Sequence, residues 1–361
     1  MRKTLLYLVI LGLLGFAIYY FLISKRGGNP YGDSEAGFKI KDTAAIGKLF
    51  IVSGDGESVL VERTDSCWMV NKKYKALRSM LNLVLTTLAQ QSALYPVTQS
   101  AYENVVKTMA TDAVKVEVYD RQGKKMSVFY VGGAAVNNTG TNMLMENARM
   151  PYVVQVPGFV GYITARYSTR LTDWRDRTVF SIPENEIKSV SIDYADKPIN
   201  SFTIARDKDS VIVTADKSLM TGLQGQNSRR ARIYLKYFAN VNCEGYLNGL
   251  SDMDTTIKTA PKQSSIDVVG LHGQHQHVEI YWMALNKRSK NMSTSNPDVP
   301  DDYDSDRLYA IINGGKDTVM IQQFAFKNIF HKAYEFFQKD EVAAPAQVQQ
   351  KQPTNVMLHK S

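Results

Sequence analysis

An internal repeat constrains the fold of this chain more than any other feature of its sequence. The segments that start at Ile46 and at Ile187 each contain two runs of alternating apolar and polar residues, followed by a third short run. The aligned positions are Ile51 with Ile192, Arg63 with Arg206, and residues 68–70 (WMV) with residues 211–213 (VIV). A chain of 361 residues suits two domains of this kind.

Each opening of three predicted strands leads into an amphipathic helix and then into a second hairpin. The apolar residues at helical spacing are Leu77, Leu81, Val84 and Leu88 in the first copy, and Tyr234, Tyr237, Phe238 and Val241 in the second. The hairpin at 116–131 aligns without a gap with the segment that starts at residue 266, which places Gly123 on Gly273 and Val128 on Val278. A tyrosine-bearing strand then closes each copy, and the second copy ends in a predicted aromatic helix within 319–337.

The N-terminal segment from Thr4 to Ile23 has the length and composition of a transmembrane helix. It contains no charge, and a helix of this length, rising about 1.5 Å per residue, would cross the roughly 30 Å hydrocarbon core of a bilayer. A cleaved signal peptide is the alternative, but its apolar region would span only ~7–15 residues and no A-x-A site follows. Arg2, Lys3 and the amino terminus slightly outweigh Lys25 and Arg26, which favours a cytoplasmic N-terminus and export of the rest.

We therefore predict an α+β fold of two tandem repeats, each a curved antiparallel sheet with a covering helix, behind one N-terminal transmembrane helix. The expected parts are a transmembrane signal anchor at 1–23, a tether at 24–45, the first repeat with its linker at 46–186, the second repeat at 187–340 and a disordered tail at 341–361. Glycine and proline mark the tether, while alanine, proline and glutamine dominate the tail.

Three of the five histidines, His272, His275 and His277, lie in the turn and strand start of the second hairpin. On a strand, His275 and His277 would share one face and could chelate a metal ion. The ungapped alignment places glutamine, lysine and serine at the same positions of the first copy, so the fold requires only polar residues there. We therefore favour a solvated hairpin tip and predict no metal site, with His275 and His277 as weak candidates for one.

The segment WRDR, from Trp174 to Arg177, brings charged residues and a tryptophan to the junction of the two copies. Arginine side chains bind carboxylate and phosphate groups in two places at once. Trp174, Arg175, Asp176 and Arg177 are therefore candidate contacts for a ligand or partner. The alternative, which we favour, is that Trp174 packs in the protein interior while its neighbours make local ion pairs and caps.

Other motif searches point away from common enzyme classes. The chain contains no P-loop, dinucleotide-binding, zinc-protease or nucleophile-elbow motif, so we predict no catalytic residue and no cofactor. Asp302, Asp304 and Asp306 occupy the first, third and fifth places of a calcium loop, but Arg307 stands where that loop requires glycine. A net charge of +8 without a basic cluster argues against nucleic acid as a partner.

Cysteine and tryptophan residues give further expectations. Cys67 and Cys243 could form a disulfide in an oxidising compartment, although two separate thiols are the commoner outcome for a lone pair. Trp68 and Trp282 fall inside strand patterns, so we expect both rings to fill a core rather than to bind a sugar or a partner at the surface.

Several short motifs occur in an order that is specific to one known group. They are FKIKDTAAIGKLFI (38–51), WMVN (68–71), YPV (95–97), FYVGG (129–133), PYVVQVPGFVG (151–161), WRDR (174–177) and DSDRLYAIING (304–314). In these motifs the chain resembles domain-of-unknown-function family 4340, in its membrane-anchored form from Gram-negative bacteria. The resemblance implies tandem α+β repeats on the periplasmic side of the inner membrane, without known catalytic residues, and an accessory role beside transport or motility components. The second copy departs from the first-repeat pattern because Val211 replaces the tryptophan.

These features predict a non-enzymatic, single-pass inner-membrane protein whose periplasmic body binds an envelope protein or complex. The alternative is a periplasmic domain that binds or hydrolyses an envelope polysaccharide or peptide at the junction near Trp174 and Arg175. Proximity labelling that finds no reproducible envelope partner would count against the first prediction. Full packing of Trp174 and Arg175, with no adjoining acidic cleft, would remove the second.

Overall fold

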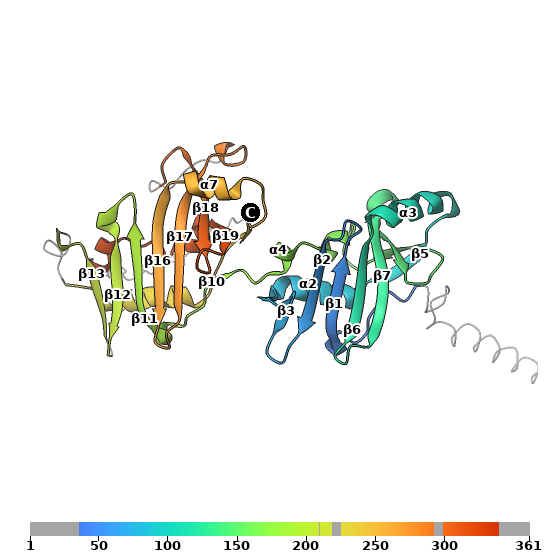
Figure 1. Ribbon diagram of the computed structural model, residues 1–361, viewed down its shortest axis with the longest axis horizontal. Coiled ribbons are helices and arrows are strands. Elements are labelled where there is room, and N and C mark those ends of the chain that lie inside the picture. The colour runs from blue at the N-terminus through green and yellow to red at the C-terminus, as the bar shows by residue number, and fades with distance from the viewer. Residues whose placement is uncertain (1–35, 209, 219–224, 292–298, 339–361) are drawn as a thin grey trace, which may run out of the picture. The chain divides into compact units, whose positions relative to one another are not determined.

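The computed structural model describes residues 36–208, 210–218, 225–291 and 299–338. These residues form two compact units, with the division between Asp176 and Arg177 (Figure 1). The predicted anchor from Thr4 to Ile23, the first part of the predicted tether and the predicted tail at 341–361 lie outside the described residues. Within the described part of the chain, no helix is both long and apolar enough to span a bilayer.

One antiparallel sheet of nine strands forms the framework of the first unit. Its strands are β1 (Ile46–Val52), β2 (Ser58–Arg63), β3 (Trp68–Val70), β4 (Tyr74–Lys75), β5 (Ser92–Pro96), β6 (Val114–Asp120), β7 (Lys125–Ala134), β8 (Thr141–Met145) and β9 (Tyr152–Gln155). Its helices are α2 (Arg78–Gln90), α3 (Gln99–Asp112) and the short α4 (Leu171–Trp174), with 3-10 turns η1 (Thr43–Ala45), η2 (Val136–Asn138) and η3 (Thr164–Tyr167). The strand order is β4-β3-β2-β1-β6-β7-β8-β9-β5.

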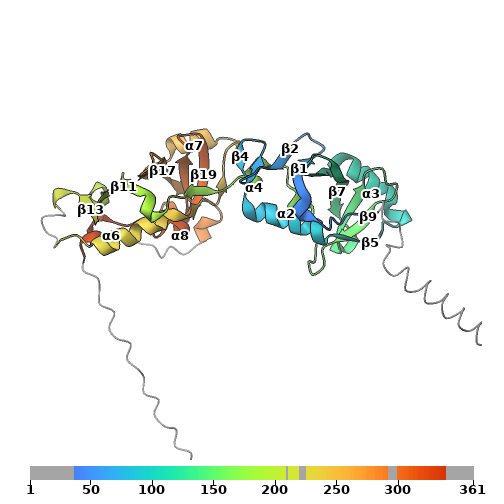
Figure 2. The same ribbon diagram turned by 90° about the horizontal axis from the view of Figure 1, so that it is seen from below.

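Helix α2 covers one face of this sheet, as Figure 2 shows. Leu81, Val84 and Leu88 recur at helical spacing and are buried in the same apolar cluster as Phe129 and Val131 of β7. Because side chains alternate between the two faces of a strand, Tyr130 and Gly132 of β7 belong to the opposite face. The predicted first helix is thereby confirmed at Leu81, Val84 and Leu88.

The second unit is built in the same way. Its strands are β10 (Thr178–Phe180), β11 (Ile187–Tyr194), β12 (Phe202–Asp207), β13 (Ser210–Ala215), β14 (Val241–Asn242), β15 (Gly245–Tyr246), β16 (Lys262–Gly270), β17 (His275–Ala284), β18 (Tyr303–Ile312) and β19 (Asp317–Gln322). Its helices are α6 (Ser228–Leu235), α7 (Met253–Thr259) and α8 (Gln323–Phe326), with 3-10 turns η4 (Glu184–Glu186), η5 (Pro198–Asn200), η6 (Lys236–Ala239), η7 (Ser289–Asn291) and η8 (Ala333–Phe337). The strand order is β13-β12-β11-β16-β17-β18-β19-β15, beside a separate pair of β10 and β14.

The two large sheets share one plan. The order β3-β2-β1-β6-β7-β8-β9-β5 of the first recurs strand for strand in the second, which supports a duplication. Gly123 and Gly273 both take a positive φ, of 81° and 82°, in equivalent hairpin turns. Arg63 donates to the carbonyl oxygen of Ala44, just before β1, and Arg206 donates to that of Glu184, just before the equivalent strand β11. The predicted α+β class with antiparallel sheets is confirmed.

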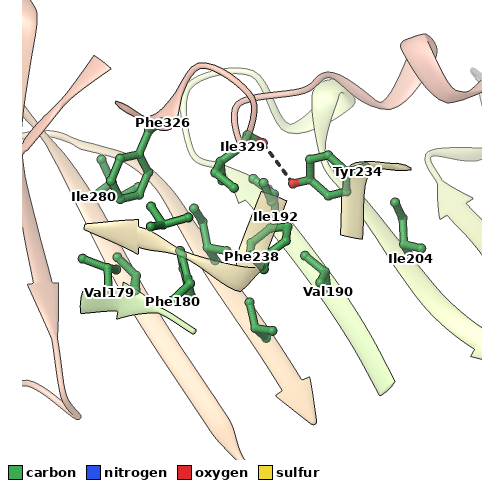
Figure 3. Packing of buried hydrophobic residues seen from close by; sticks show 14 of the residues in the cluster. Val179, Phe180, Val190, Ile192, Ile204, Tyr234, Phe238, Ile280, Phe326 and Ile329 are labelled. Atoms are coloured by element: carbon green, nitrogen blue, oxygen red, sulfur yellow. Dashed lines mark hydrogen bonds between the residues drawn. The ribbon is translucent and has the colours of Figure 1, made fainter. Parts of the chain in front are cut away.

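A group of aromatic residues packs together within the largely aliphatic core of the second unit. Figure 3 shows Tyr234 of α6 beside Phe238, with its hydroxyl donating to the carbonyl oxygen of Ile329 at 2.9 Å. Phe180 meets Phe238 edge to face, with ring centroids 5.2 Å apart. The buried hydroxyl of Tyr234 therefore has an acceptor. Aromatic rings from β10, from the α6–η6 region and from the C-terminal segment pack in one core.

Two helices predicted in the second copy are wrong in extent. Helix α6 ends at Leu235, and Val241 lies in β14 rather than on the helix. The aromatic segment at 319–337 forms the end of β19, the four-residue α8 and the turn η8 instead of one helix. Tyrosine hydroxyls bind the carbonyl oxygens of Ile329 and His331, which a continuous helix would need for its own hydrogen bonds. Tertiary contacts therefore override the helical spacing.

Candidate functional site

Helix α3 lies on the face of the first sheet that α2 leaves open, beside β7 (Figure 1). Met109 is its only buried residue, so most of the helix surface is available to solvent or to a ligand. Gly132 of β7 allows the close approach of α3, because a Cβ atom at this position would lie 2.9 Å from Cγ of Met109. The equivalent helix of the second unit, α7, has only seven residues. The longer helix therefore distinguishes the first unit from the second.

Two cavities flank α3 and share Met109, and we call them together the α3 groove. The larger, of about 520 Å³, is lined chiefly by Val97, Ala101, Val105, Met109, Val136 and Val153. The smaller, of about 370 Å³, is lined chiefly by Val52, Val106, Met109, Ala110, Tyr130 and Leu144. Val136, in the turn after β7, is 75% exposed and extends the apolar surface outward. Volumes of this size can hold several side chains of a partner.

The α3 groove carries almost no charge. Lys115 is the one charged residue that lines either cavity, whereas 22% of the chain is charged. Its ammonium group lies 2.7 Å from Oε1 of Glu117, and this hydrogen bond raises the pKa of Lys115. Polar groups at the edge are uncharged: the Tyr95 and Thr139 hydroxyls lie 3.1 Å apart. Depletion of charge at an apolar centre with a polar rim is typical of a protein interface.

The predicted contacts at the junction of the copies do not form one exposed cluster. Trp174 is fully buried in the first unit, and its Nε1 donates to the carbonyl oxygen of Ser168 at 2.8 Å. Arg175 is also buried, with its guanidinium group 3.8 Å from the centroid of the Tyr74 ring. Asp176 ends the first unit and Arg177 begins the second. Trp174 and Arg175 therefore serve as interior groups of the first unit.

The histidines of the second hairpin form a hydrogen-bonded network on one carboxylate. Nε2 of His275 and Nδ1 of His277 lie 2.7 and 2.9 Å from the same oxygen of Asp267. Burial raises the pKa of Asp267, but the hydrogen bonds from His277 and His275 outweigh it and lower the pKa overall. No group of three or more His, Cys, Asp or Glu residues in the described ranges is arranged to hold a metal ion. His272 lies outside this network, and its backbone nitrogen donates to Oε1 of Gln274.

Two of the aspartates at calcium-loop spacing belong to an ion-paired strand. Asp304 and Asp306 lie in β18, and Asp304 is fully buried. Its carboxylate accepts hydrogen bonds from the backbone nitrogens of Asp306 and Arg307 and lies 2.9 Å from Nη2 of Arg288. A guanidinium group, rather than a metal ion, neutralises the buried carboxylate.

The cysteines and the remaining tryptophans lie in ordinary structural positions. Cys67 is half-buried in the first unit and Cys243 is buried in the second, and the two do not form a disulfide. Trp282 is buried and stacks on Tyr303, with ring centroids 5.4 Å apart, as expected for a core residue. Trp68 is only partly buried, below Arg63, so the expectation of a core position holds in part.

A smaller cavity in the second unit has the opposite character. It has a volume of about 190 Å³, and its lining includes Lys197, Lys327 and Lys332 but only one acid, Asp196. Gln323 also lines it, and the Nε2 atom of this residue is buried without a hydrogen-bond partner among the described residues. Three cationic side chains and a free amide donor suit an anionic ligand. We call this cavity the lysine cavity.

The sequence analysis predicted neither the α3 groove nor the lysine cavity. Ala101, Val105 and Met109 recur at intervals of four residues and could have indicated helix α3. The lysine cavity joins residues from β11, β16, β17 and α8 that are distant in sequence, so no local pattern signals it.

Comparisons with models of known protein families, with curated proteins and with solved structures find no match to this chain. The resemblance to domain-of-unknown-function family 4340 accordingly rests on the short motifs alone. The α3 groove and the lysine cavity must be interpreted from their own chemistry.

Proposed function

We propose that this chain is a non-enzymatic, single-pass inner-membrane protein whose periplasmic body binds an envelope protein through the α3 groove. The observation that carries the proposal is the groove itself, which is apolar, nearly uncharged and found beside the longer of two equivalent helices. The uncharged segment from Thr4 to Ile23 supports anchoring. The occupant that fits is an uncharged apolar segment of a partner, because a charged one would lose its hydration without gaining an ion pair.

The groove can be tested by site-specific photo-cross-linking in intact cells. A benzophenone side chain at Val136 should cross-link to one partner, whereas the same group at Leu83, an exposed apolar residue on α2, should not. Adding Ala101→Glu should lower the cross-link yield about tenfold or more, because the carboxylate would be desolvated in the groove.

The matched control for this substitution is Ser100→Glu, on the polar rim of the same cavity, which should reduce the yield much less. Equal cross-linking from Val136 and Leu83, or a yield that Ala101→Glu leaves unchanged, would contradict the proposed role of the groove.

The lysine cavity supports a second candidate function, the binding of an acidic envelope polysaccharide or peptide. Its three lysines and the free amide of Gln323 carry this candidate, and the proposal moves the ligand site from the junction of the copies to the second unit. Calorimetry of the detergent-solubilised full chain with a trimer of galacturonic acid should detect binding. Replacing Lys197 and Lys327 together with alanine should weaken it about tenfold or more.

The control for these lysines is Lys258→Ala on α7, which removes one positive charge away from the cavity lining. This second candidate function would be contradicted if the unmodified chain binds no trimer. It would also be contradicted if the Lys197→Ala, Lys327→Ala double variant binds the trimer as well as the Lys258→Ala variant does.

A further inference from the structure

The loop at 157–162 exposes more apolar surface than any neighbouring part of the first unit. Val160 is 94% exposed, Tyr162 is 53% exposed and Phe159 is 39% exposed. The loop contains no charged residue, and glycines at 158 and 161 take positive φ values of 80° and 126° that shape its tip. Three large apolar side chains on one short loop are unusual on a solvated surface, where such residues usually occur singly.

Hydrogen bonds and buried residues fix the loop at both of its ends. The backbone nitrogen of Phe159 donates to the carbonyl oxygen of Val156 at 3.0 Å, and that of Ile163 donates to Oγ1 of Thr141 at 2.8 Å. Val156 and Ile163 are both buried. The guanidinium group of Arg166 lies 4.2 Å from the centroid of the Phe159 ring. The apolar tip therefore projects from fixed ends.

The chain enters the first unit beside this loop. The carbonyl oxygen of Phe38 accepts a hydrogen bond from Nε2 of Gln91 at 2.7 Å. The next residue, Ser92, pairs with Gln155, which stands two residues before the loop. Phe38, near the start of the first unit, and Gln155, just before the loop, thus lie at the same end of the sheet.

The surroundings of the loop are basic. Lys39 and Lys41 are exposed at the point where the chain enters, and the guanidinium group of Arg166 lies over the Phe159 ring of the loop. An apolar tip among basic residues complements a lipid surface, because the tip can enter the acyl boundary while the cations face anionic headgroups.

We propose that the loop at 157–162 inserts its tip into the membrane that anchors the chain. The inference rests on the proposed function, since it requires Thr4 to Ile23 to lie in that membrane. Twelve residues separate Ile23 from Ala36 and can span at most about 40 Å. The loop shares an end of the sheet with the point where the chain enters, so this tether keeps it within reach of the bilayer, and an inserted loop would orient the α3 groove with respect to the membrane surface.

Brominated lipids can test the position of the loop. The full chain carrying Val160→Trp is reconstituted in vesicles with acidic phospholipids, with and without bromine on the acyl chains. Bromine quenches tryptophan only where the two are in contact, so the fluorescence that Val160→Trp adds should fall at least about twofold. The unmodified chain, with Trp68, Trp174 and Trp282, supplies the background.

Met126→Trp is the matched control, because Met126 is an exposed apolar residue at the opposite end of β7. Its added fluorescence should not fall. Equal quenching at the two positions, or no quenching at position 160 in vesicles that carry the chain, would overturn this inference but not the proposed anchoring. The exposed loop would then be a surface that contacts a protein instead of lipid. A chain that fails to float with the vesicles would overturn the proposed anchoring, and this inference with it.

Discussion

Replacing Trp174 with alanine should lower the free energy of unfolding of the first unit by about 3–5 kcal/mol, the usual cost of removing a large buried ring. Trp174 is fully buried in the core that also contains Leu81 and Val84, and its Nε1 has a backbone acceptor. The substitution would leave both a cavity and an unpaired carbonyl oxygen on Ser168. Urea unfolding followed by circular dichroism and by hydrogen exchange in the first unit measures the loss.

Trp68→Ala is the control for this prediction, since Trp68 is only partly buried at the edge of the same cluster. It should cost clearly less than Trp174→Ala. A Trp174→Ala variant that unfolds like the unmodified chain but loses a ligand would contradict the interior role and return Trp174 to the candidate binding residues.

Replacing Asp304 with alanine should destabilise the second unit by about 3 kcal/mol. Its buried carboxylate accepts two backbone N–H groups, of Asp306 and Arg307, and lies beside the amide of Asn286 and the guanidinium of Arg288. Alanine would leave the two backbone donors without the fully buried carboxylate that accepts from them. Urea unfolding monitored in the second unit gives the value.

The neighbouring Asp306 provides the comparison, because its carboxylate also pairs with Arg288, at 3.0 Å, but is 30% exposed. Asp306→Ala should cost about 1 kcal/mol or less, as solvent screens such a pair. Equal losses for the two substitutions would show that burial does not set the strength of this network.

The repeat made much of the fold predictable. Ile51 and Ile192, the turn glycines 123 and 273, and the strands β1 and β11 fall where the alignment places them. Alternation and helical spacing depend on local sequence, so they predicted β1, β2 and α2 well. The prediction of one helix at 319–337 was wrong because tyrosine hydroxyls from distant elements bind carbonyl oxygens of this segment. No local pattern encodes such a contact.

The candidate sites were less predictable than the fold. Trp174 and Arg175 form an unusual sequence motif, yet both are interior groups. The α3 groove depends on Gly132 and on a helix from another part of the chain, and the lysine cavity depends on four separate elements. Cavities form where distant segments leave space between them, so they follow from tertiary packing rather than from motif spacing.

We propose that the two units face the periplasm, where an envelope partner can reach the α3 groove. The most direct measurement is protease digestion of spheroplasts with intact inner membranes, followed by detection of the first and second units separately. Digestion of both units from outside, with a cytoplasmic control protein intact, is the result that the proposed topology predicts. Protection of both units until the membrane is lysed would place them in the cytoplasm and contradict the claim.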